Sequence, residues 1–382
     1  AASDVYKRQN YQFTLNDHHN FTLMGGYQEE DNDYSYMKNS ITGLYSTNNP
    51  NLGMGTGDKV VVDTRNGWAT RGFFGRINYD YDGRYLLELN GRYDGSSRFP
   101  KNDRFGFFPS ISAAWIISQE KFMHATQNWL NYAKLRISYG ALGNQDVSYY
   151  EYIASMGSSE QQLLINGIKP MGVTPSGLVS NSLTWEKVYT KNIGLDLNFF
   201  NNRLTFSGDI YRRDTKDMLT KGKTLPSVLG ALEPRINAAD MKTEGWEISL
   251  DWNDRIGNVQ YYLGFNLYDS RTKITKYDNE VGLLGKDSDD NLIYRKGMEL
   301  GEIWGYTTDR LYTTEDFDSQ GKLKNNIPKV EGYNPNPGDI LYVDFDGNGI
   351  INNGKNTSNE PGDTRIIGND TVSYTHLRAH ET

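Results

Sequence analysis

Side chains near the carboxyl end of the sequence have the spacing of a calcium-binding loop. Asp344, Asp346 and Asn348 occupy positions one, three and five of such a loop, and Gly349 supplies the sharp turn at position six. Ile350 offers its backbone carbonyl at position seven. Oxygen ligands that alternate around a tight turn suit a hard cation of this size. The spacing therefore predicts a calcium site.

The same segment has a second interpretation. Position twelve is Lys355, where a calcium loop of this type carries a bidentate glutamate. A metal-free turn, in which Asp, Asn and Gly side chains organise the backbone, explains the composition as well. Both alternatives remain open from the sequence.

Catalytic constellations are not found. His18 and His19 fall in an expected turn and His124 follows a short link, without a nucleophile or an orienting partner nearby in the sequence. No glycine loop that would cradle a phosphate precedes a helix. A solvated acidic loop explains a cluster of carboxylates better than glycosidase chemistry does. The cluster consists of Asp287, Asp289 and Asp290. We expect the protein not to be an enzyme.

Composition narrows the class of protein. The chain has 382 residues, no cysteine and a net charge of −8, which excludes a disulfide framework and argues against a nucleic-acid partner. Aromatic residues reach 13%, while hydrophobic residues make up only 37%. No apolar run approaches the roughly 18 residues of a membrane-spanning helix. A membrane barrel remains compatible, because only alternate strand residues face lipid and aromatics mark both interfaces.

Period-two alternation is the strongest structural signal. Phe73 and Ile77 fall on one face of an expected strand, whereas Arg76 and Asn78 fall on the other. Asp82-Gly83 follows as a favoured hairpin turn. The next segment repeats the alternation. Such strands are expected near 11–16, 20–30, 71–82, 84–94, 106–118, 133–143, 190–200, 203–216, 243–253 and 259–270.

The links between these strands alternate in length. Short turns are expected at 17–19, 82–83, 201–202 and 254–258, and the 118–131 link is expected to hold a helical turn near 120–123. Long polar segments are expected at 31–70, 95–105, 144–189, 217–242 and 271–371. Short turns at one end and long loops at the other are typical of an outer-membrane barrel with periplasmic turns and extracellular loops. The fold expected is an all-β, antiparallel transmembrane barrel of roughly ten strands, left open because the chain is truncated.

Tryptophans and tyrosines carry two interpretations each. Four tryptophans lie in or beside expected strands, where their rings suit the headgroup boundary or, alternatively, the core of a soluble sandwich. Three loop tyrosines could stack on sugars, although loop packing or an interfacial position explains them equally well. These residues are Trp115, Trp185, Trp246 and Trp252, and Tyr149, Tyr150 and Tyr152.

Both ends of the chain are expected to be non-native. Residues 1–9 resemble the translation of a sequencing adapter, and residues 372–382 resemble the partner adapter read in the opposite direction. The alternative is an ordinary disordered tail. With no signal peptide at the start, we expect a translated fragment in which residues 10–371 belong to the barrel. His376 and His380 go with the excluded end.

An ordered series of motifs resembles the SusC/RagA family of TonB-linked outer-membrane transporters. Each motif alone is weak, but the order is maintained from about residue 11 to residue 371. The motifs are Gly75–Tyr81, Arg84–Leu87, Arg92–Phe99, Phe108–Trp115, Glu120–Met123, Lys134–Gly140, Gly143–Gln145, Leu183–Lys187, Asn192–Asp196, Asn202–Leu204, Asp217–Leu219, Asn237, Gly245–Glu247 and Gly338–Ile340.

The resemblance implies a large barrel in the outer membrane of a Gram-negative bacterium, with an N-terminal plug and a TonB-type energy-coupling partner. It also implies a SusD-like surface lipoprotein that helps to capture oligosaccharide or peptide. The plug and the closing strands are expected to lie outside this chain. The family pattern adds Asp363 as the late acidic ligand of the Asp344 loop, which would stiffen an extracellular loop with or without calcium. Polar side chains expected to line the passage are Arg76, Glu88, Arg92 and Arg136.

Two rival functions are distinguished by strand length and by site chemistry. A soluble, secreted, carbohydrate-binding β-sandwich predicts strands of about six residues. An enzyme on a β-scaffold requires a convergent set of titrating groups, which is not found. Among transporters, a siderophore-type TonB-dependent receptor is the nearest alternative.

Overall fold

A computed structural model describes residues 2–221, 225–231, 233–279, 282–285, 293–371 and 374–381. Within these ranges the protein is built from β-strands and a few short 3-10 helices. None of the helices in the described ranges combines the length and the apolarity needed to span a bilayer.

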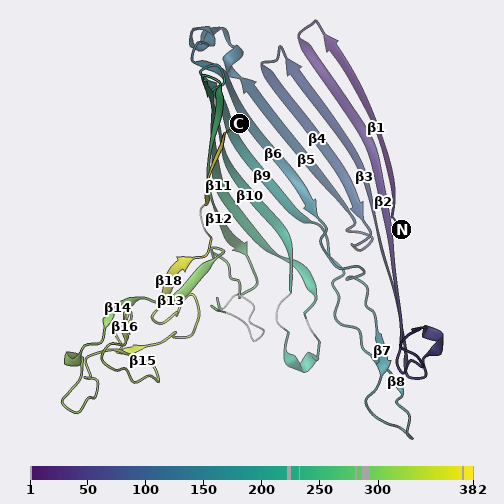
Figure 1. Ribbon diagram of the computed structural model, residues 1–382, viewed down its shortest axis with the longest axis vertical. Coiled ribbons are helices and arrows are strands. Elements are labelled where there is room, and N and C mark those ends of the chain that lie inside the picture. The colour runs from purple at the N-terminus through teal and green to yellow at the C-terminus, as the bar shows by residue number, and fades with distance from the viewer. Residues whose placement is uncertain are drawn as a thin grey trace. The chain divides into compact units, whose positions relative to one another are not determined.

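One sheet contains all the long strands, and its spatial order follows the chain (Figure 1). Its first and last strands are not neighbours in that order, as expected for a barrel that is not closed. All ten predicted strands are present, at 12 to 23 residues each. A sandwich of short strands is therefore wrong. The ten strands are β1 (Ala2–Leu15), β2 (His19–Ile41), β3 (Lys59–Tyr81), β4 (Tyr85–Ser96), β5 (Phe105–Ile116), β6 (Leu130–Asn144), β9 (Glu186–Phe199), β10 (Leu204–Lys221), β11 (Arg235–Ile256) and β12 (Val259–Lys276). The shorter β19 (Tyr374–Glu381) pairs with β12 in the same sheet.

Several strands are longer than the alternation predicted. Parts of the expected loops 31–70 and 217–242 belong to strands, because β2 continues to Ile41 and β11 begins at Arg235. The expected 254–258 turn shrinks to Gly257 and Asn258, since β11 continues to Ile256. Alternation did not predict these extensions, because polar side chains occur on both of their faces and the pattern requires one apolar face.

The described chain divides into two compact units. The first comprises residues 1–120, 136–189 and 219–237, and the second comprises residues 121–135, 190–218 and 238–382.

Left-handed residues close the short turns of the first unit. Asn16 and Asp17 have φ of 50° and 57°, and Asp82 and Gly83 have φ of 51° and 66°. Successive positive φ values match the twist of antiparallel strands, and Asn, Asp and Gly tolerate them best. Three residues rather than two separate the last paired residues Tyr81 and Tyr85, since Arg84 also lies in the turn.

The strand register sorts side chains of the first unit into an apolar face and a polar face. Across five strands, Tyr11, Leu23, Ile77, Leu89 and Ile111 lie opposite one another in a single row. Ile77, Leu89 and Ile111 are 44%, 37% and 44% exposed, although they are fully apolar. A continuous exposed apolar face of this kind suits contact with lipid.

A row on the opposite face is polar. It contains Gln12, Thr22, Asn78, Glu88 and Ser112, one from each of the same five strands. The two rows differ by a single residue along every strand, so no slip in register is tolerated. We call this side of the first unit the polar face.

Aromatic side chains mark the turn end of the apolar face. The last row consists of Leu15, His19, Tyr81, Tyr85 and Trp115. Tyr85 stacks on Trp115 with ring centroids 6.4 Å apart. Trp115 thus takes the position expected of an interfacial ring.

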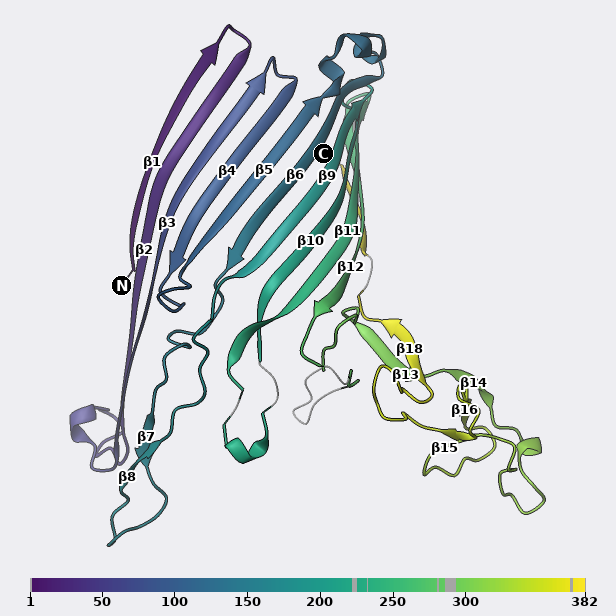
Figure 2. The same cartoon turned by 180° about the vertical axis from the view of Figure 1, so that it is seen from behind.

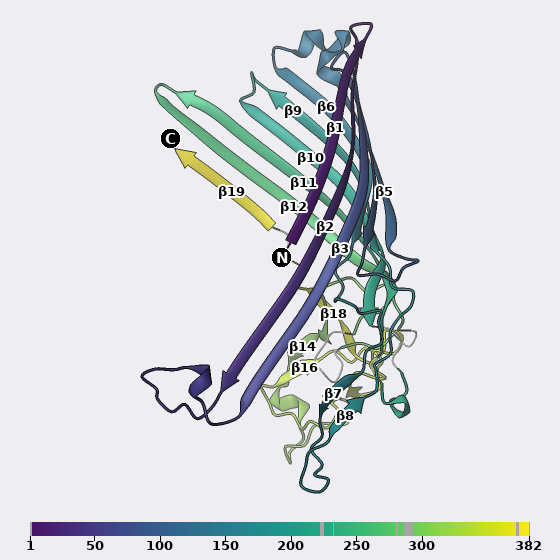
Figure 3. The same ribbon diagram turned by 90° about the vertical axis from the view of Figure 1, so that its right-hand side faces the viewer.

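Long segments project from the other end of the strands in the first unit. Figure 3 shows β2 and β3 running together to the 42–58 segment, which contains η1 (Leu52–Met54). Figure 2 shows the hairpin of β7 (Gly157–Glu160) and β8 (Met171–Thr174) at the strand ends opposite the β1–β2 and β3–β4 turns. η2 (Ile117–Gln119) and η4 (Ser227–Leu229) complete the first unit.

The second unit includes a small lobe, which lies between β12 and β19 in the sequence. Its core contains the buried side chains of Tyr312, Leu341 and Ile351. The predicted helical turn after residue 118 is η3 (Lys121–Thr126), also in this unit. The lobe consists of β13 (Glu302–Tyr306) with β18 (Thr364–Asn369), β14 (Thr308–Leu311) with β16 (Ile340–Tyr342), β15 (Lys329–Val330) with β17 (Ile350–Ile351), and η5 (Thr314–Asp316).

Candidate functional site

Predicted passage residues lie on the polar face of the first unit. Arg76 donates from Nε to Oδ1 of Asn90 at 2.6 Å, and Glu88 and Arg92 follow on the same face of β4. Arg136, also predicted for the passage, lies in β6.

An apolar cluster anchors loop segments at the loop end of the polar face. It contains Phe99, Phe108, Val147, Leu183 and Trp185, all buried, and we call it the rim cluster. Trp185 meets Phe108 edge-on with ring centroids 5.3 Å apart. The indole is only 5% exposed, so the predicted interfacial position of Trp185 is wrong. Loop residues that fold over the ring produce this burial, and strand alternation does not reveal such contacts.

Tyrosines and arginines bind the same loops together. The guanidinium of Arg98 lies over Tyr149, 4.9 Å from the ring centroid, and donates to the carbonyl of Val147 at 3.0 Å. Tyr150 accepts the backbone N–H of Gly67 at 3.0 Å, and Tyr152 donates to the carbonyl of Ser97. All three tyrosines therefore make contacts that pack the loops together.

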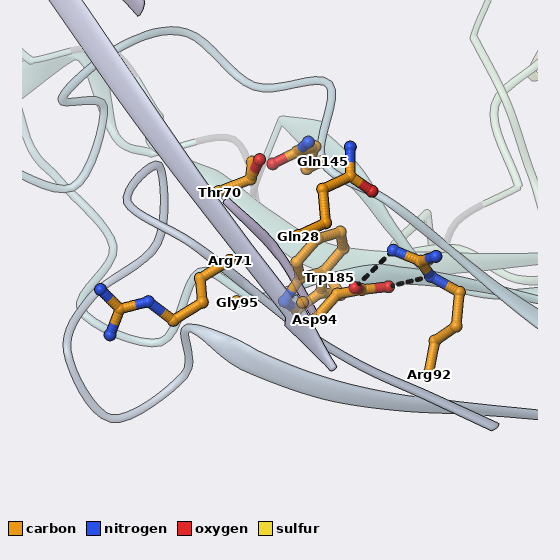
Figure 4. Close-up of a pocket in the computed structure, with 10 residues that line it drawn as sticks. Gln28, Thr70, Arg71, Arg92, Asp94, Gly95, Gln145 and Trp185 are labelled. Atoms are coloured by element: carbon orange, nitrogen blue, oxygen red, sulfur yellow. Dashed lines mark hydrogen bonds and ion pairs between the residues drawn. The ribbon is translucent and has the colours of Figure 1, made fainter. Parts of the chain in front are cut away.

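A cavity of about 230 Å³ opens on the polar face beside the rim cluster. Its wall combines residues of β2, β3 and β4 with the end of β6 and with Trp185 (Figure 4). A cross-strand row runs along the cavity: Gln28 pairs with Gly72, which pairs with Asp94. Because Gly72 has no side chain, the carboxylate of Asp94 can lie over it. A Cβ at Gly72 would overlap Oδ1 of Asp94.

Charged groups around the cavity are paired. Arg92 donates from Nε and from one Nη to the two carboxylate oxygens of Asp94 at 3.0 and 2.9 Å. Such a bidentate pair fixes both side chains more firmly than a single contact does. Arg71 contributes its backbone only, because its side chain points away from the cavity and meets Glu29 at 2.7 Å (Figure 4).

Uncharged polar groups at the cavity have spare hydrogen-bonding capacity. Within the described ranges, the side chain of Gln145 has a buried Oε1 atom without a partner. Gln28 and Thr70 line the same cavity from β2 and β3. A primary amide offers two donors and a carbonyl acceptor, and a hydroxyl offers one donor and two lone pairs. The lining residues therefore offer both donors and acceptors of hydrogen bonds.

Sequence reasoning identified Arg92 as a passage residue but missed the cavity. The available signal was local: Arg92 and Asp94 lie two residues apart on one strand face. That Gly72 stands opposite them, and that Gln145 and Trp185 approach from distant loops, depends on strand register and loop packing.

The predicted Asp344 loop brings three carboxylates together. Oxygen atoms of Asp344, Asp346 and Asp363 lie within 4.8 Å of one another. Asp344 accepts the backbone N–H groups of Gly347 and Gly349, each at 2.8 Å. A carboxylate oxygen that accepts one N–H retains a lone pair, so these contacts accommodate a cation as well as a metal-free turn.

The remaining predicted ligands are placed less favourably. Asn348 turns its Oδ1 toward the backbone N–H of Ile350 at 2.7 Å, and Ile350 begins β17. Lys355, at position twelve, pairs with Glu360 at 2.8 Å. Asn348 is therefore engaged by the backbone, while β15 and the residue that follows it donate to the carbonyls of Gly349 and Ile351 rather than to that of Ile350.

Asp363 connects the two ends of this loop. It is fully buried, and its two oxygens accept the backbone N–H groups of Phe345 at 2.7 Å and of Asn352 at 3.0 Å. Arg365 covers the Phe345 ring at 4.1 Å from its centroid. Asp363 thus holds the turn in place by hydrogen bonds within the protein.

Histidines and the remaining tryptophans have structural contacts. His18 meets Asp82 through Nδ1 at 2.5 Å, and Nδ1 of His19 lies 2.9 Å from the Tyr79 hydroxyl. Trp252 donates to the hydroxyl of Tyr261 at 3.3 Å. Trp246 lies in β11, and His124 lies in η3. The acidic loop of Asp287, Asp289 and Asp290 lies outside the described residues.

A comparison with protein-family models matches residues 2–348 to the β-barrel of TonB-dependent receptor-like proteins. TonB-dependent receptor P3 of Formosa agariphila is 29% identical over 94% of this chain and 35% of its own length. TonB-dependent receptor SusC of Bacteroides thetaiotaomicron is 28% identical over 78% of this chain and 28% of its own length. The chain thus spans about a third of the curated relatives that it matches.

Solved structures show the same fold. The RagAB peptide importer in its closed-closed state superposes with a TM-score of 0.74 at 23% identity, over 90% of this chain and 36% of that chain. The RagAB peptide transporter gives a TM-score of 0.71 at 24% identity, over 84% and 36%.

Proposed function

Because the chain belongs to the family of TonB-dependent receptor β-barrels, which lie in the outer membrane of Gram-negative bacteria, we propose that it forms wall and extracellular loops of a nutrient importer. The nutrient is an oligosaccharide or a peptide. The chain contributes the passage through its polar face and contributes loops that meet the nutrient outside.

One observation carries this proposal: the register places apolar and polar rows on opposite faces of the same five strands. The row of Ile77, Leu89 and Ile111 offers lipid an apolar surface, while the row of Asn78, Glu88 and Ser112 offers water a polar one. A wall with these two faces separates hydrocarbon from an aqueous passage.

Two partners belong to the proposal. A SusD-like surface lipoprotein would receive nutrient at the extracellular loops, and a TonB-type complex would supply energy, as the resemblance to SusC-type transporters implies. The relation to SusC, at 28% identity, supports both.

For the Asp344 loop we propose bound calcium, with the carboxylates of Asp344, Asp346 and Asp363 as ligands. The convergence of their oxygens within 4.8 Å supports the ion. Calcium would then stiffen an extracellular loop and take no part in chemistry.

Uptake measurements test the importer. Deletion of the gene should abolish growth on one oligosaccharide or peptide source, and the receptor supplied in trans should restore it. Removal of the TonB-type energy supply should abolish the same growth, while growth on glucose provides the control. Normal uptake in the deletion strain, or uptake that survives loss of energy coupling, contradicts the proposal.

A further inference from the structure

We propose that the cavity bounded by Gln28, Thr70, Asp94, Gln145 and Trp185 is a binding subsite for one uncharged, hydroxyl-rich sugar ring of the imported nutrient. This inference rests on the proposed function. It adds where on the strand wall the nutrient binds and which chemical class of ligand binds there.

The location suits a ligand that enters the passage. The lining residues from β2, β3 and β4 belong to the polar face, at the end from which the long loops project. A nutrient passing from the loops into the passage therefore reaches this cavity near its entrance.

Charge balance favours an uncharged ligand. Arg92 and Asp94 neutralise each other through two hydrogen bonds of 3.0 and 2.9 Å. Arg71 meets Glu29 and points away from the cavity. A phosphate or carboxylate would meet arginines whose charge is already balanced by a neighbouring carboxylate, whereas an uncharged group needs no counter-charge.

Unused hydrogen-bonding groups select a ligand that both donates and accepts. Among the described residues, Oε1 of Gln145 is buried without a partner, and the amide of Gln28 and the hydroxyl of Thr70 face the same space (Figure 4). Buried polar atoms are normally paired, so rotation of the Gln145 amide toward the cavity would let this acceptor gain a donor from a ligand. Sugar hydroxyls meet amides and hydroxyls in both roles.

Size and rigidity limit the ligand to a single ring. At about 230 Å³ the cavity is smaller than the roughly 300–1,000 Å³ of sites that enclose drug-sized molecules. The Trp185 ring is immobilised by the rim cluster and by its hydrogen bond to the Arg104 carbonyl at 2.7 Å. A fixed aromatic wall with a few converging polar groups is typical of small-ligand sites.

Binding to the intact receptor in detergent tests the subsite apart from transport. The probes are neutral hexasaccharides of glucose, mannose and xylose, with uncharged hexapeptides as a second set, measured by titration calorimetry. We expect one saccharide to bind, and Gln145→Leu and Thr70→Val each to weaken it about tenfold, because each removes one hydrogen-bonding partner. Gln161→Leu, the same change on an exposed loop residue, should bind like the wild type.

The outcomes separate this inference from the importer itself. Saccharide binding that is equal in wild type, Gln145→Leu and Thr70→Val overturns the subsite even if energy-dependent uptake is normal. Binding of peptides alone overturns the sugar assignment, as does the absence of binding by any saccharide. Weakened saccharide binding in both variants, with Gln161→Leu unchanged, supports the subsite even in cells where uptake fails.

Discussion

Trp185 donates its indole N–H to the backbone carbonyl of Arg104 at 2.7 Å, across 81 residues of sequence. The bond connects the residue before β9 to the residue before β5. It places an aromatic ring from a long loop against the polar face and completes one wall of the cavity.

Two substitutions of Trp185 should separate the contribution of its hydrogen bond to stability from the contribution of its packing. Trp185→Phe keeps an aromatic ring but loses the N–H donor, and we expect a loss of about 1 kcal/mol in local stability. Trp185→Ala also empties the rim cluster and should cost about 3–5 kcal/mol. Hydrogen exchange of residues 183–187 in the purified receptor measures both. Equal protection in the two variants would contradict the packing role.

The orientation of the two strand faces predicts opposite effects for neighbouring residues. Ile111→Arg places a charge on the apolar face about 13 Å from the Trp115 row, at ~3.3 Å per residue. Near the bilayer midplane this should cost about 2–4 kcal/mol. Ser112→Arg, its control, faces Glu88 across the polar row and should be tolerated. The measurement is the amount of folded receptor in outer membranes, which is quantified by heat-dependent gel mobility. A folding defect in Ser112→Arg alone would show that the lipid-facing and water-facing sides are assigned the wrong way round.

Asp363 should govern the order of the Asp344 loop. Asp363→Asn keeps one acceptor, but its amide N–H₂ then faces a backbone N–H, so one buried donor loses its partner. We expect a loss of about 1–3 kcal/mol, read as faster hydrogen exchange at residues 344–353. Asp309→Asn is the control, because its side chain is exposed and lies outside this loop. Unchanged exchange in Asp363→Asn would show that other contacts hold the loop.

Calcium binding by the same loop has a direct measurement. Titration of metal-free receptor with CaCl₂ should release heat, and the double variant with both Asp344→Asn and Asp346→Asn should release none. Calcium should also slow hydrogen exchange at residues 344–353 of the wild type. Asp309→Asn, an exposed acid elsewhere in the lobe, should leave the titration unchanged. Identical heats in wild type and the double variant would favour the metal-free turn.

Acid should loosen the η5 turn of the lobe. Two hydrogen bonds from Arg310, at 2.6 and 2.8 Å, and the N–H and O–H of Thr313 hold the pKa of Asp316 well below its usual value. Because the folded-state pKa is the lower one, the stabilisation is complete above about pH 4, the unfolded pKa, and is lost as pH falls toward the folded pKa.

This pH dependence is measured by the protection of residues 313–317 against hydrogen exchange, corrected for intrinsic rates. Protection should decline below about pH 4 in the wild type. Asp316→Asn should be less protected at neutral pH and should lack the acid-dependent decline. Asp309→Asn, which removes another carboxylate near Arg310, controls for general charge effects. If the loss of protection below about pH 4 persists in Asp316→Asn, a group other than Asp316 causes it.

The sequence by itself determined the strands, the short turns and the sidedness of the wall. Ile77 beside Asn78, and Asp82-Gly83 after them, are local signals, because alternation and left-handed turns depend on neighbouring residues. The long extensions of β2 and β11 were missed because polar residues interrupt both of their faces, so neither face is continuously apolar. The one-three-five spacing of Asp344, Asp346 and Asn348 was equally local.

Only the tertiary structure decided which distant residues meet. Gln28, Gly72 and Asp94 form one row through strand register, and Gln145 and Trp185 arrive from loops. A register shift of one residue would turn every one of those strand side chains to the opposite face. The cavity therefore depends on pairing and loop packing over long sequence separations, which local alternation does not encode.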